Sequence, residues 1–324
     1  MSRPRTLAIA AVVILIALAL LPLVAEKFTV QFATRILIMA IFAMSLNLLV
    51  GHAGLVSLGH AAFFGLAGYC LALSSPQYQA ANFWTSLPLA MMAAGALALV
   101  IGALVLRTSG IYFIMATLAF AQMLYFLLHD TSIGGGSDGM YIYVRPDAGL
   151  FGWRAFDLDK FGDFYFVVLA LFLIVFGFIG VLRASLFGRV LAGIRVNEQR
   201  MRSLGFATFR YKLACFVIAG TLAGLAGYLA AAQFGVVNPD MLGWQLSGAV
   251  LMMVILGGMG TLAGPVIGAA AMLLLELGLQ SLPMAGAINL GKHWQLPMGI
   301  AIVLVALYLP NGIARLLRRG SADD

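Results

Sequence analysis

Long apolar runs separated by short polar intervals dominate the chain. One run covers about 7–21, after Arg3 and Arg5, and nine more follow at about 33–50, 58–75, 84–106, 110–128, 163–183, 210–232, 245–257, 264–282 and 296–310. Many of these runs approach the roughly 20 residues that a helix needs to cross a bilayer. The pattern predicts an all-α polytopic membrane protein with about ten transmembrane helices. The first run resembles a signal peptide, but Leu23-Val24-Ala25 is a poor cleavage site, so we expect an uncleaved helix.

The run at 245–257 is shorter than the others and leads directly into the glycine-rich sequence GGMGTLAGP. A run of this length predicts a half-helix or a broken helix. At membrane depth such a break is tolerated only where the backbone is buried in protein or lines a cavity.

One interval between apolar runs is long and strongly charged. The sequence from Ser185 to Lys212, SLFGRVLAGIRVNEQRMRSLGFATFRYK, contains helix-forming residues around 190–204, and Gly188 and Gly205 stand where a short helix would begin and end. The interval is too polar to cross a bilayer, so we expect it on the cytoplasmic side. It is either a solvated positive loop or a docking helix, at about 185–205, that receives force from a soluble partner.

Composition supports the membrane assignment. The 324 residues are 63% hydrophobic and only 10% charged, with a mean hydropathy of +1.03. The net charge is +7, and the positively charged residues lie between apolar runs and not on an open basic face. Their distribution indicates a membrane protein and not a nucleic-acid-binding one. The two cysteines lie inside apolar runs and predict no disulfide. No catalytic motif has the context that it requires, so we expect neither enzyme activity nor a cofactor.

The distribution of positive charge predicts the orientation. With ten spans and both termini inside, thirteen of the 19 lysines and arginines fall inside: Arg3, Arg5, Arg107, Arg183, Arg189, Arg195, Arg200, Arg202, Arg210, Lys212, Arg315, Arg318 and Arg319. Six fall outside: Lys27, Arg35, Arg145, Arg154, Lys160 and Lys292. The longest outer loop, at about 129–162, carries five aspartates. This bias follows the positive-inside rule.

Two glycine-rich segments are candidates for the translocation pathway. They lie within 45–69 and 257–268, where small residues allow close helix approach or unwound backbone beside a pathway. Plain helix packing is the alternative. The pathway candidates are Gly51, His52, Gly54, Ser57, Gly59, His60, Gly257, Gly258 and Gly260. The two histidines are eight residues apart without a carboxylate or thiol nearby, so a metal site is not expected.

Glu276 is the one acidic residue that lies inside a predicted span, away from its ends. An ion-coupled carrier usually has more ionisable groups at mid-membrane, because each is costly unless it is partnered. Their scarcity indicates that the energy for transport comes from elsewhere.

Four ordered motifs resemble the high-affinity branched-chain amino acid importer permeases. They are LNLLVGHAGLVSLGHAAFFGLAGY at 46–69, GGGSDGM at 134–140, FGRVLAGIRVNEQRMRSLG at 187–205 and VILGGMGTLAGPVIGA at 254–269, followed by PNG at 310–312. The resemblance covers about 33–315. Val196 stands where these permeases usually have Glu, and Met201 where a small residue is common. By resemblance, the residues that couple the chain to an ATPase are Arg195, Asn197, Glu198, Arg200 and Gly205.

The resemblance implies one transmembrane permease domain over 1–324, with an importer fold similar to that of the vitamin B12 permease. It also implies a bacterial inner-membrane location and four kinds of partner: membrane lipid, a sister permease, two cytoplasmic ABC ATPase subunits and an extracytoplasmic solute-binding protein. Relatives that import urea, short amides or other amino acids look similar. An ion-coupled secondary transporter and a polytopic membrane enzyme are the other classes considered.

Overall fold

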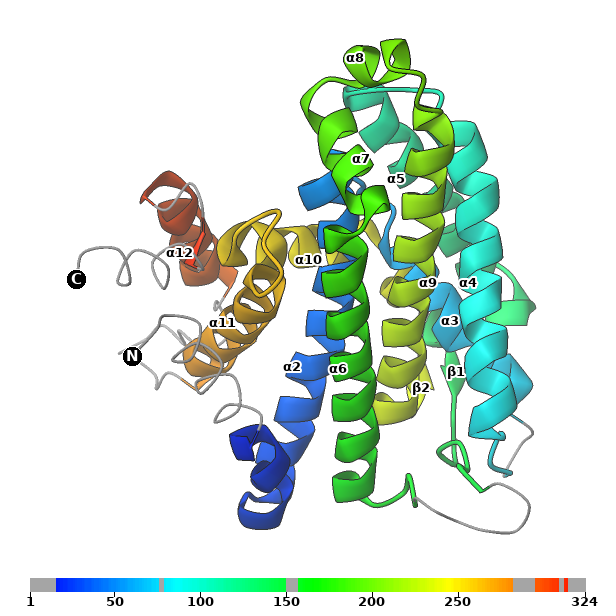
Figure 1. The fold of residues 1–324 in the computed structure, drawn as a ribbon. Coiled ribbons are helices and arrows are strands. Elements are labelled where there is room, and N and C mark those ends of the chain that lie inside the picture. The colour runs from blue at the N-terminus through cyan, green and yellow to red at the C-terminus, as the bar shows by residue number, and fades with distance from the viewer. Residues whose placement is uncertain (1–15, 76–78, 150–156, 282–294, 309–311, 314–324) are drawn as a thin grey trace, which may run out of the picture.

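The computed structural model describes residues 16–75, 79–149, 157–281, 295–308 and 312–313. Within them, each of the last nine apolar runs contains a helix (Figure 1). These are α2 (Lys27–Asn47), α3 (Ala61–Ser74), α4 (Phe83–Val105), α5 (Ile111–His129), α6 (Phe161–Ala184), α9 (Thr208–Phe234), α10 (Trp244–Gly257), α11 (Gly264–Gln280) and α12 (Gln295–Tyr308). Much of the first run lies outside the described residues, and its described part is helical at 16–24. The predicted helical, multi-pass architecture is confirmed at this level.

Short elements connect the long helices. A π-helix, η1 (Leu48–Ala53), continues α2, and three 3₁₀ helices follow later: η2 (Ser132–Gly134), η3 (Gly136–Asp138) and η4 (Pro239–Leu242). Two short strands, β1 (Met140–Tyr141) and β2 (Val236–Val237), pair antiparallel, with Met140 opposite Val237. The predicted outer loop is thereby joined to the segment that follows α9, a small departure from an all-α fold.

The helix α9 lies at the centre of one half of the molecule, where it packs against α2, α3 and α4. Of its most apolar 18 residues, 72% are buried. Gly220 and Gly224 are four apart on one face, and a Cβ added to either would lie 2.5 Å from an alanine Cβ of α4. Small residues at this spacing let two membrane helices approach closely.

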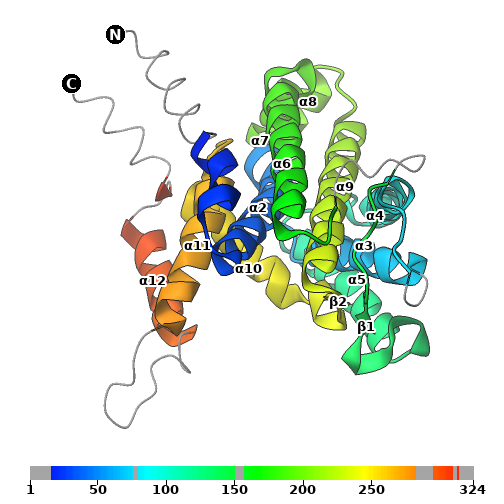
Figure 2. The ribbon, with the colours of Figure 1, turned by 90° about the horizontal axis from the view of Figure 1, so that it is seen from below.

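The helix α2 joins this half to the rest of the molecule. It packs against α6 and α9, and also against α10 and α11. Figures 1 and 2 show α11 and α12 on one side of α2 and α3, α4 and α5 on the other. The helix α10 runs between these groups and contacts α11, α2, α3 and α5. In the most apolar 18 residues of the span formed by α2 and η1, 83% are buried, which explains why this long apolar segment has no clearly polar face.

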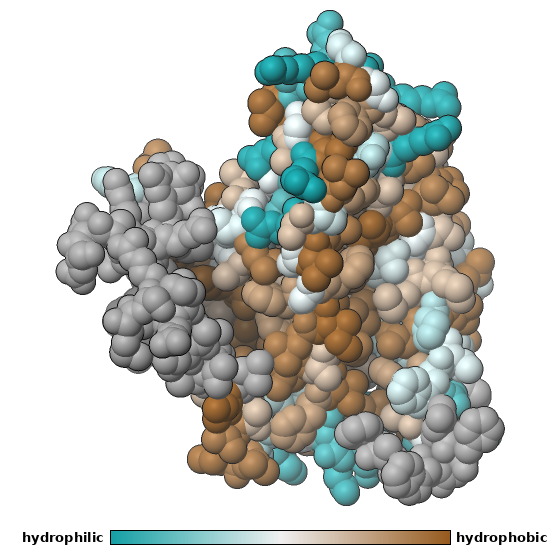
Figure 3. All heavy atoms as spheres, in the orientation of Figure 1, coloured by the Kyte–Doolittle hydropathy of each residue, from teal (hydrophilic) through white to brown (hydrophobic). Residues whose placement is uncertain are grey.

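The outer helices turn apolar side chains to the outside. In the apolar windows of α4, α5 and α6, only 33%, 22% and 33% of residues are buried. Figure 3 shows hydrophobic residues over most of the body of the molecule and hydrophilic ones at the end that contains α8 and at the opposite end. A surface of this kind is stable in hydrocarbon and not in water.

The start of α2 differs from the prediction. The helix begins at Lys27 and not near residue 33, because Phe28, Val30 and Phe32 extend the apolar pattern toward the amino terminus. Arg35 therefore lies eight residues inside the helix, about 12 Å along its axis. Its partner there is Glu276 of α11, at 3.6 Å. Arg3, Arg5, Arg315, Arg318 and Arg319 lie outside the described residues, and the predicted orientation stays a prediction.

Candidate functional site

The charged interval forms two helices where one was predicted. They are α7 (Leu186–Val196) and α8 (Glu198–Ser203), separated by Asn197 in an extended conformation with φ −157° and ψ 100°. The Asn197 side-chain oxygen accepts a hydrogen bond from the Arg200 amide at 2.9 Å. Asparagine commonly caps a helix in this way, and here it breaks α7 and starts α8. The helix begins after Ser185, so Gly188 does not mark its start as predicted. Gly205, at φ +86°, follows α8.

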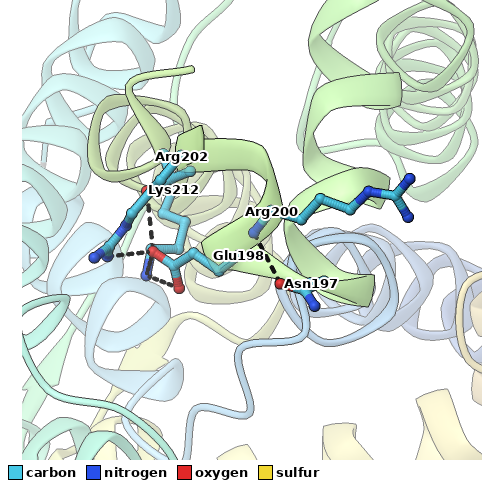
Figure 4. A network of polar contacts seen from close by, with 6 residues as sticks. Asn197, Glu198, Arg200, Arg202 and Lys212 are labelled. Carbon is cyan, nitrogen blue, oxygen red and sulfur yellow. Dashed lines mark hydrogen bonds and ion pairs between the residues drawn. The ribbon is translucent and has the colours of Figure 1, made fainter. Parts of the chain in front are cut away.

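Glu198 fixes α8 to the start of α9 (Figure 4). Its carboxylate accepts hydrogen bonds from Arg202 Nη2 at 2.7 Å, from Thr208 Oγ1 at 3.0 Å and from Lys212 Nζ at 3.0 Å. The Lys212 side chain is only 8% exposed, so the pair is largely out of water. Burial by itself would raise the pKa of Glu198, but the bonds from Lys212, Arg202 and Thr208 together hold that pKa below its ordinary value.

Arg200 points away from this cluster, on the other side of α8 (Figure 4). Two apolar residues of the same segment are exposed as well: Val196, the last residue of α7, is 86% exposed, and Leu204, directly after α8, is 66% exposed. A polar helix pair that exposes apolar side chains and an outward-pointing arginine has a surface suited to a protein partner.

Arg195 connects α7 to both glycine-rich segments. Its guanidinium donates a hydrogen bond to the Gly51 carbonyl of η1. A Cβ added to Gly54 would lie 3.1 Å from Arg195 Cγ, and one added to Gly260 would lie 3.3 Å from Arg195 Nη1. One arginine predicted for coupling thus contacts three residues predicted for the pathway.

Asn47 holds the two glycine-rich segments together. Its side-chain oxygen accepts a hydrogen bond from the Gly260 amide, and its side-chain nitrogen donates one to the Thr261 carbonyl, both at 2.9 Å. The side chain is 2% exposed, so losing either bond would leave a buried polar atom unpaired. Sequence reasoning did not select Asn47. The available signal was a lone amide inside an apolar run, immediately before the glycine cluster.

The break between α10 and α11 has the predicted position. The helix α10 ends at Gly257, Gly258 and Gly260 have φ of 114° and 76°, and α11 begins at Gly264. The backbone at Gly260 comes so near η1 that a Cβ on Gly51 would lie 2.5 Å from the Gly260 nitrogen. We call the group formed by Asn47, Gly51, Arg195, Gly260 and Thr261 the junction.

The other pathway candidates lie away from the junction or at its edge. His52 Nδ1 is 3.2 Å from the Asn47 carbonyl. Ser57 is buried and accepts from the Gly59 amide at 3.3 Å. His60 is fully buried, with its ring stacked on Phe42 at 5.6 Å and its Nε2 2.9 Å from Ser45 Oγ. The structure therefore brings Gly51, Gly54 and Gly260 together with Arg195, and it places Ser57, Gly59 and His60 in the packed core beyond them.

No cluster of three or more His, Cys, Asp or Glu side chains that could hold a metal occurs among the described residues. The junction consists of backbone groups, the Asn47 amide, the Arg195 guanidinium and the Thr261 hydroxyl, which donates to the Gly258 carbonyl at 2.9 Å. Such groups can hold two segments together and release them, and none of them is a general base that could activate the hydroxyl.

Comparison with known proteins identifies the family. The family described as "Branched-chain amino acid transport system / permease component" matches residues 28–309. The chain belongs to this permease family. The permease protein LivM of the high-affinity branched-chain amino acid transport system of Escherichia coli K12 is 32% identical over 92% of this chain and 72% of LivM. LivM of Salmonella typhimurium LT2 is equally similar, with the same coverage.

A more distant relative covers less of the chain. The xylose transport system permease XylH of Escherichia coli K12 is 29% identical over 46% of this chain and 37% of XylH. No solved structure matches. The predicted family is confirmed, and membership in a permease family agrees with the apolar helices: the chain is a multi-pass membrane protein and a transport component.

Proposed function

We propose that the chain is the permease subunit of an ATP-driven, binding-protein-dependent importer of branched-chain amino acids. It forms one transmembrane permease domain in the bacterial inner membrane, with both termini and the helices α7 and α8 in the cytoplasm. A sister permease, two ABC ATPase subunits and an extracytoplasmic binding protein complete the transporter.

The observation that carries the proposal is the contact of Arg195 with the Gly51 carbonyl. An ATPase that binds the exposed face of α7 and α8 moves α7, and Arg195 passes that movement to η1. Asn47 ties η1 to the break between α10 and α11, so both glycine-rich segments move together. The backbone there is irregular and bends without breaking a regular helix, which is what alternating access requires of a gate.

Reconstitution tests the proposal. Vesicles that contain the permease pair and the ATPases, supplied with binding protein and radiolabelled leucine, are expected to accumulate leucine only when ATP is present. Ionophores that collapse proton and sodium gradients should leave the rate unchanged. Valine and isoleucine should compete, whereas urea and acetamide should not. Uptake by this chain alone, driven by an ion gradient, would instead establish a secondary carrier. Competition by urea would show that the transported solute is not restricted to branched-chain amino acids.

A further inference from the structure

A groove lies where α2, α3, α9 and α10 meet. Figure 1 shows that the start of α2 and the end of α9 lie away from α7 and α8. The groove has a volume of about 290 Å³, and its lining includes Arg35, Ile38, Met39, Phe64, Gln233 and Leu246. Small-ligand sites begin at about 300 Å³, so this groove suits a molecule of very few heavy atoms.

Arg35 places a positive charge on the wall of this groove, inside an otherwise apolar stretch of α2. Its Nη2 lies 3.6 Å from Glu276 Oε2, and the two side chains are 39% and 19% exposed. Tightly hydrogen-bonded pairs of this kind are about 2.7–2.9 Å apart, so this pair is loose. Charges within a span are costly and usually functional. The Arg35 guanidinium and the Glu276 carboxylate can therefore still form hydrogen bonds with a molecule at the edge of the groove.

The rest of the wall is mostly apolar, with two polar exceptions, Gln233 and Asn238. Ile38 and Phe64 are 2% and 3% exposed, so they are rigidly held. Gln233 donates from Nε2 to the Gln31 carbonyl at 2.8 Å, and its Oε1 is buried with no partner among the described residues. Buried acceptors in native proteins are nearly always satisfied, and a ligand's donor would satisfy this one.

We propose that this groove is a binding site for a free aliphatic amino acid on its way into the permease. The proposal rests on the proposed function and adds to it a site within the permease itself. The α-carboxylate binds the Arg35 guanidinium, the α-ammonium lies toward Glu276 and Gln233, and the aliphatic side chain packs along Ile38, Phe64 and Leu246. A zwitterion adds no net charge to a site whose own charges already balance, so it avoids the cost of burying an unpaired ion. Urea and simple amides lack the carboxylate that Arg35 would recognise.

Photolabelling of the assembled complex tests the site. The probe is leucine with a diazirine in its side chain, added to the complex in lipid nanodiscs without binding protein or nucleotide. We expect labelled peptides from α2 and from the start of α10, with excess leucine preventing the labelling. The primary amide of the same probe, which keeps the ammonium and lacks the carboxylate, should label about tenfold less, the effect of one lost charge-assisted hydrogen bond.

Two variants separate recognition from folding. Arg35→Gln should reduce labelling by the carboxylate probe about tenfold and leave labelling by the amide probe unchanged, because only the carboxylate needs the guanidinium. Lys27→Gln removes a cation from the same end of α2 outside the groove and should change neither. If the Arg35→Gln complex does not assemble, the comparison of the carboxylate and amide probes on the unmodified complex still tests whether the groove recognises a carboxylate.

Labelling outside the groove, labelling that leucine does not prevent, or equal labelling by both probes would overturn the site. ATP-driven leucine uptake is measured on the same complexes. Normal uptake by the unmodified complex together with any of those labelling results would refute the proposed binding site while the proposed importer function is retained. Absence of ATP-driven uptake would instead remove the proposed function.

Discussion

Glu198 is the side chain that fixes α8 to the rest of the molecule, and its behaviour with pH follows from its contacts. Its pKa is lowered in the folded protein, so its ionised form stabilises the fold. That stabilisation is complete above the ordinary carboxyl pKa of about 4.3 and is lost as the pH falls through the lower, folded-state pKa. At neutral pH the stabilisation by the Glu198 carboxylate is therefore insensitive to pH, and it is lost only at pH values below the ordinary carboxyl pKa.

Glu198→Lys should abolish uptake. It places a third cation beside Arg202 and the nearly buried Lys212, and removes hydrogen bonds to charged donors that are worth about 2 kcal/mol each. Glu198→Gln keeps an acceptor for Thr208 without the charge and should retain part of the uptake. The measurements are leucine uptake in vesicles and the rate of proteolysis at α8. Arg200→Gln is the control for proteolysis, since Arg200 points away from the cluster. Unchanged uptake in Glu198→Lys would show α8 to be only a solvated loop.

Which residues of the junction could be predicted depended on residue type. Glycine clusters between apolar runs are visible in a sequence, so Gly51 and Gly260 were selected, and Arg195 was selected through the family resemblance of its motif. Asn47 was not, because nothing in its neighbours indicates that its amide reaches Thr261, 214 positions away. The pairing of Arg35 with Glu276 was not predicted for the same reason, because nothing in the sequence near either residue indicates its partner.

At the scale of elements, η1 and the break after α10 form one unit, held at a backbone approach that has no space for a side chain. Alanine substitutions test this unit. Gly51→Ala would place Cβ 2.5 Å from the Gly260 nitrogen, and Gly260→Ala would add a side chain at φ +76°, at a cost of about 1–2 kcal/mol. Both should lower the midpoint of thermal unfolding and reduce uptake.

Gly248→Ala is the matched control for these two substitutions. It lies within α10, and an added Cβ there has no atom within 4 Å. Alanine should leave the unfolding midpoint unchanged or raise it, since it favours helix over glycine by about 1 kcal/mol. Equal effects at all three positions would mean that the close approach of the two segments is unimportant.

The element that transmits force is α7, through Arg195. Arg195→Met keeps a side chain of similar length and removes the donor to the Gly51 carbonyl. We expect the complex to keep hydrolysing ATP while leucine uptake falls about tenfold, the loss of one charge-assisted hydrogen bond. Arg189→Met removes the same charge from an exposed position on the same helix. Weaker ATPase binding in this variant would lower uptake and hydrolysis together, so the ratio of uptake to hydrolysis should stay unchanged. A normal ratio of leucine uptake to ATP hydrolysis in Arg195→Met would contradict the proposal that Arg195 transmits movement from α7 to η1.

Element positions were more predictable than element ends. Apolar runs located nine helices, because length and hydropathy are what the bilayer selects. The break of the charged interval at Asn197 was missed, since local capping by one side chain overrode helix-forming neighbours on both sides. The π-helix was missed as well, because its sequence LLVGHA differs little from an ordinary helix end.

On the scale of the whole molecule, the proposed pathway predicts where water reaches the bundle. In a chain with Cys70→Ser, single cysteines at His52 and Met259 should react with a charged thiol reagent, at rates that change when nucleotide binds. Cys215 is fully buried and can remain. Ile174→Cys, on the apolar outer side of α6, should be inert although Ile174 is 64% exposed, because lipid covers it. Inertness at both test positions in every nucleotide state would favour plain helix packing over a pathway.

The central place of α9 has a consequence for how the chain is made. The ribosome completes α2, α3, α4, α5 and α6 before it reaches Thr208, so these helices enter the membrane without the helix that most of them pack against. The small side chains of α4 that meet Gly220 and Gly224 face lipid until then. A nascent chain released before residue 208 should therefore insert with normal topology yet be degraded rapidly. Pulse-chase labelling of chains that end at 205 and at 240 would measure the difference in lifetime.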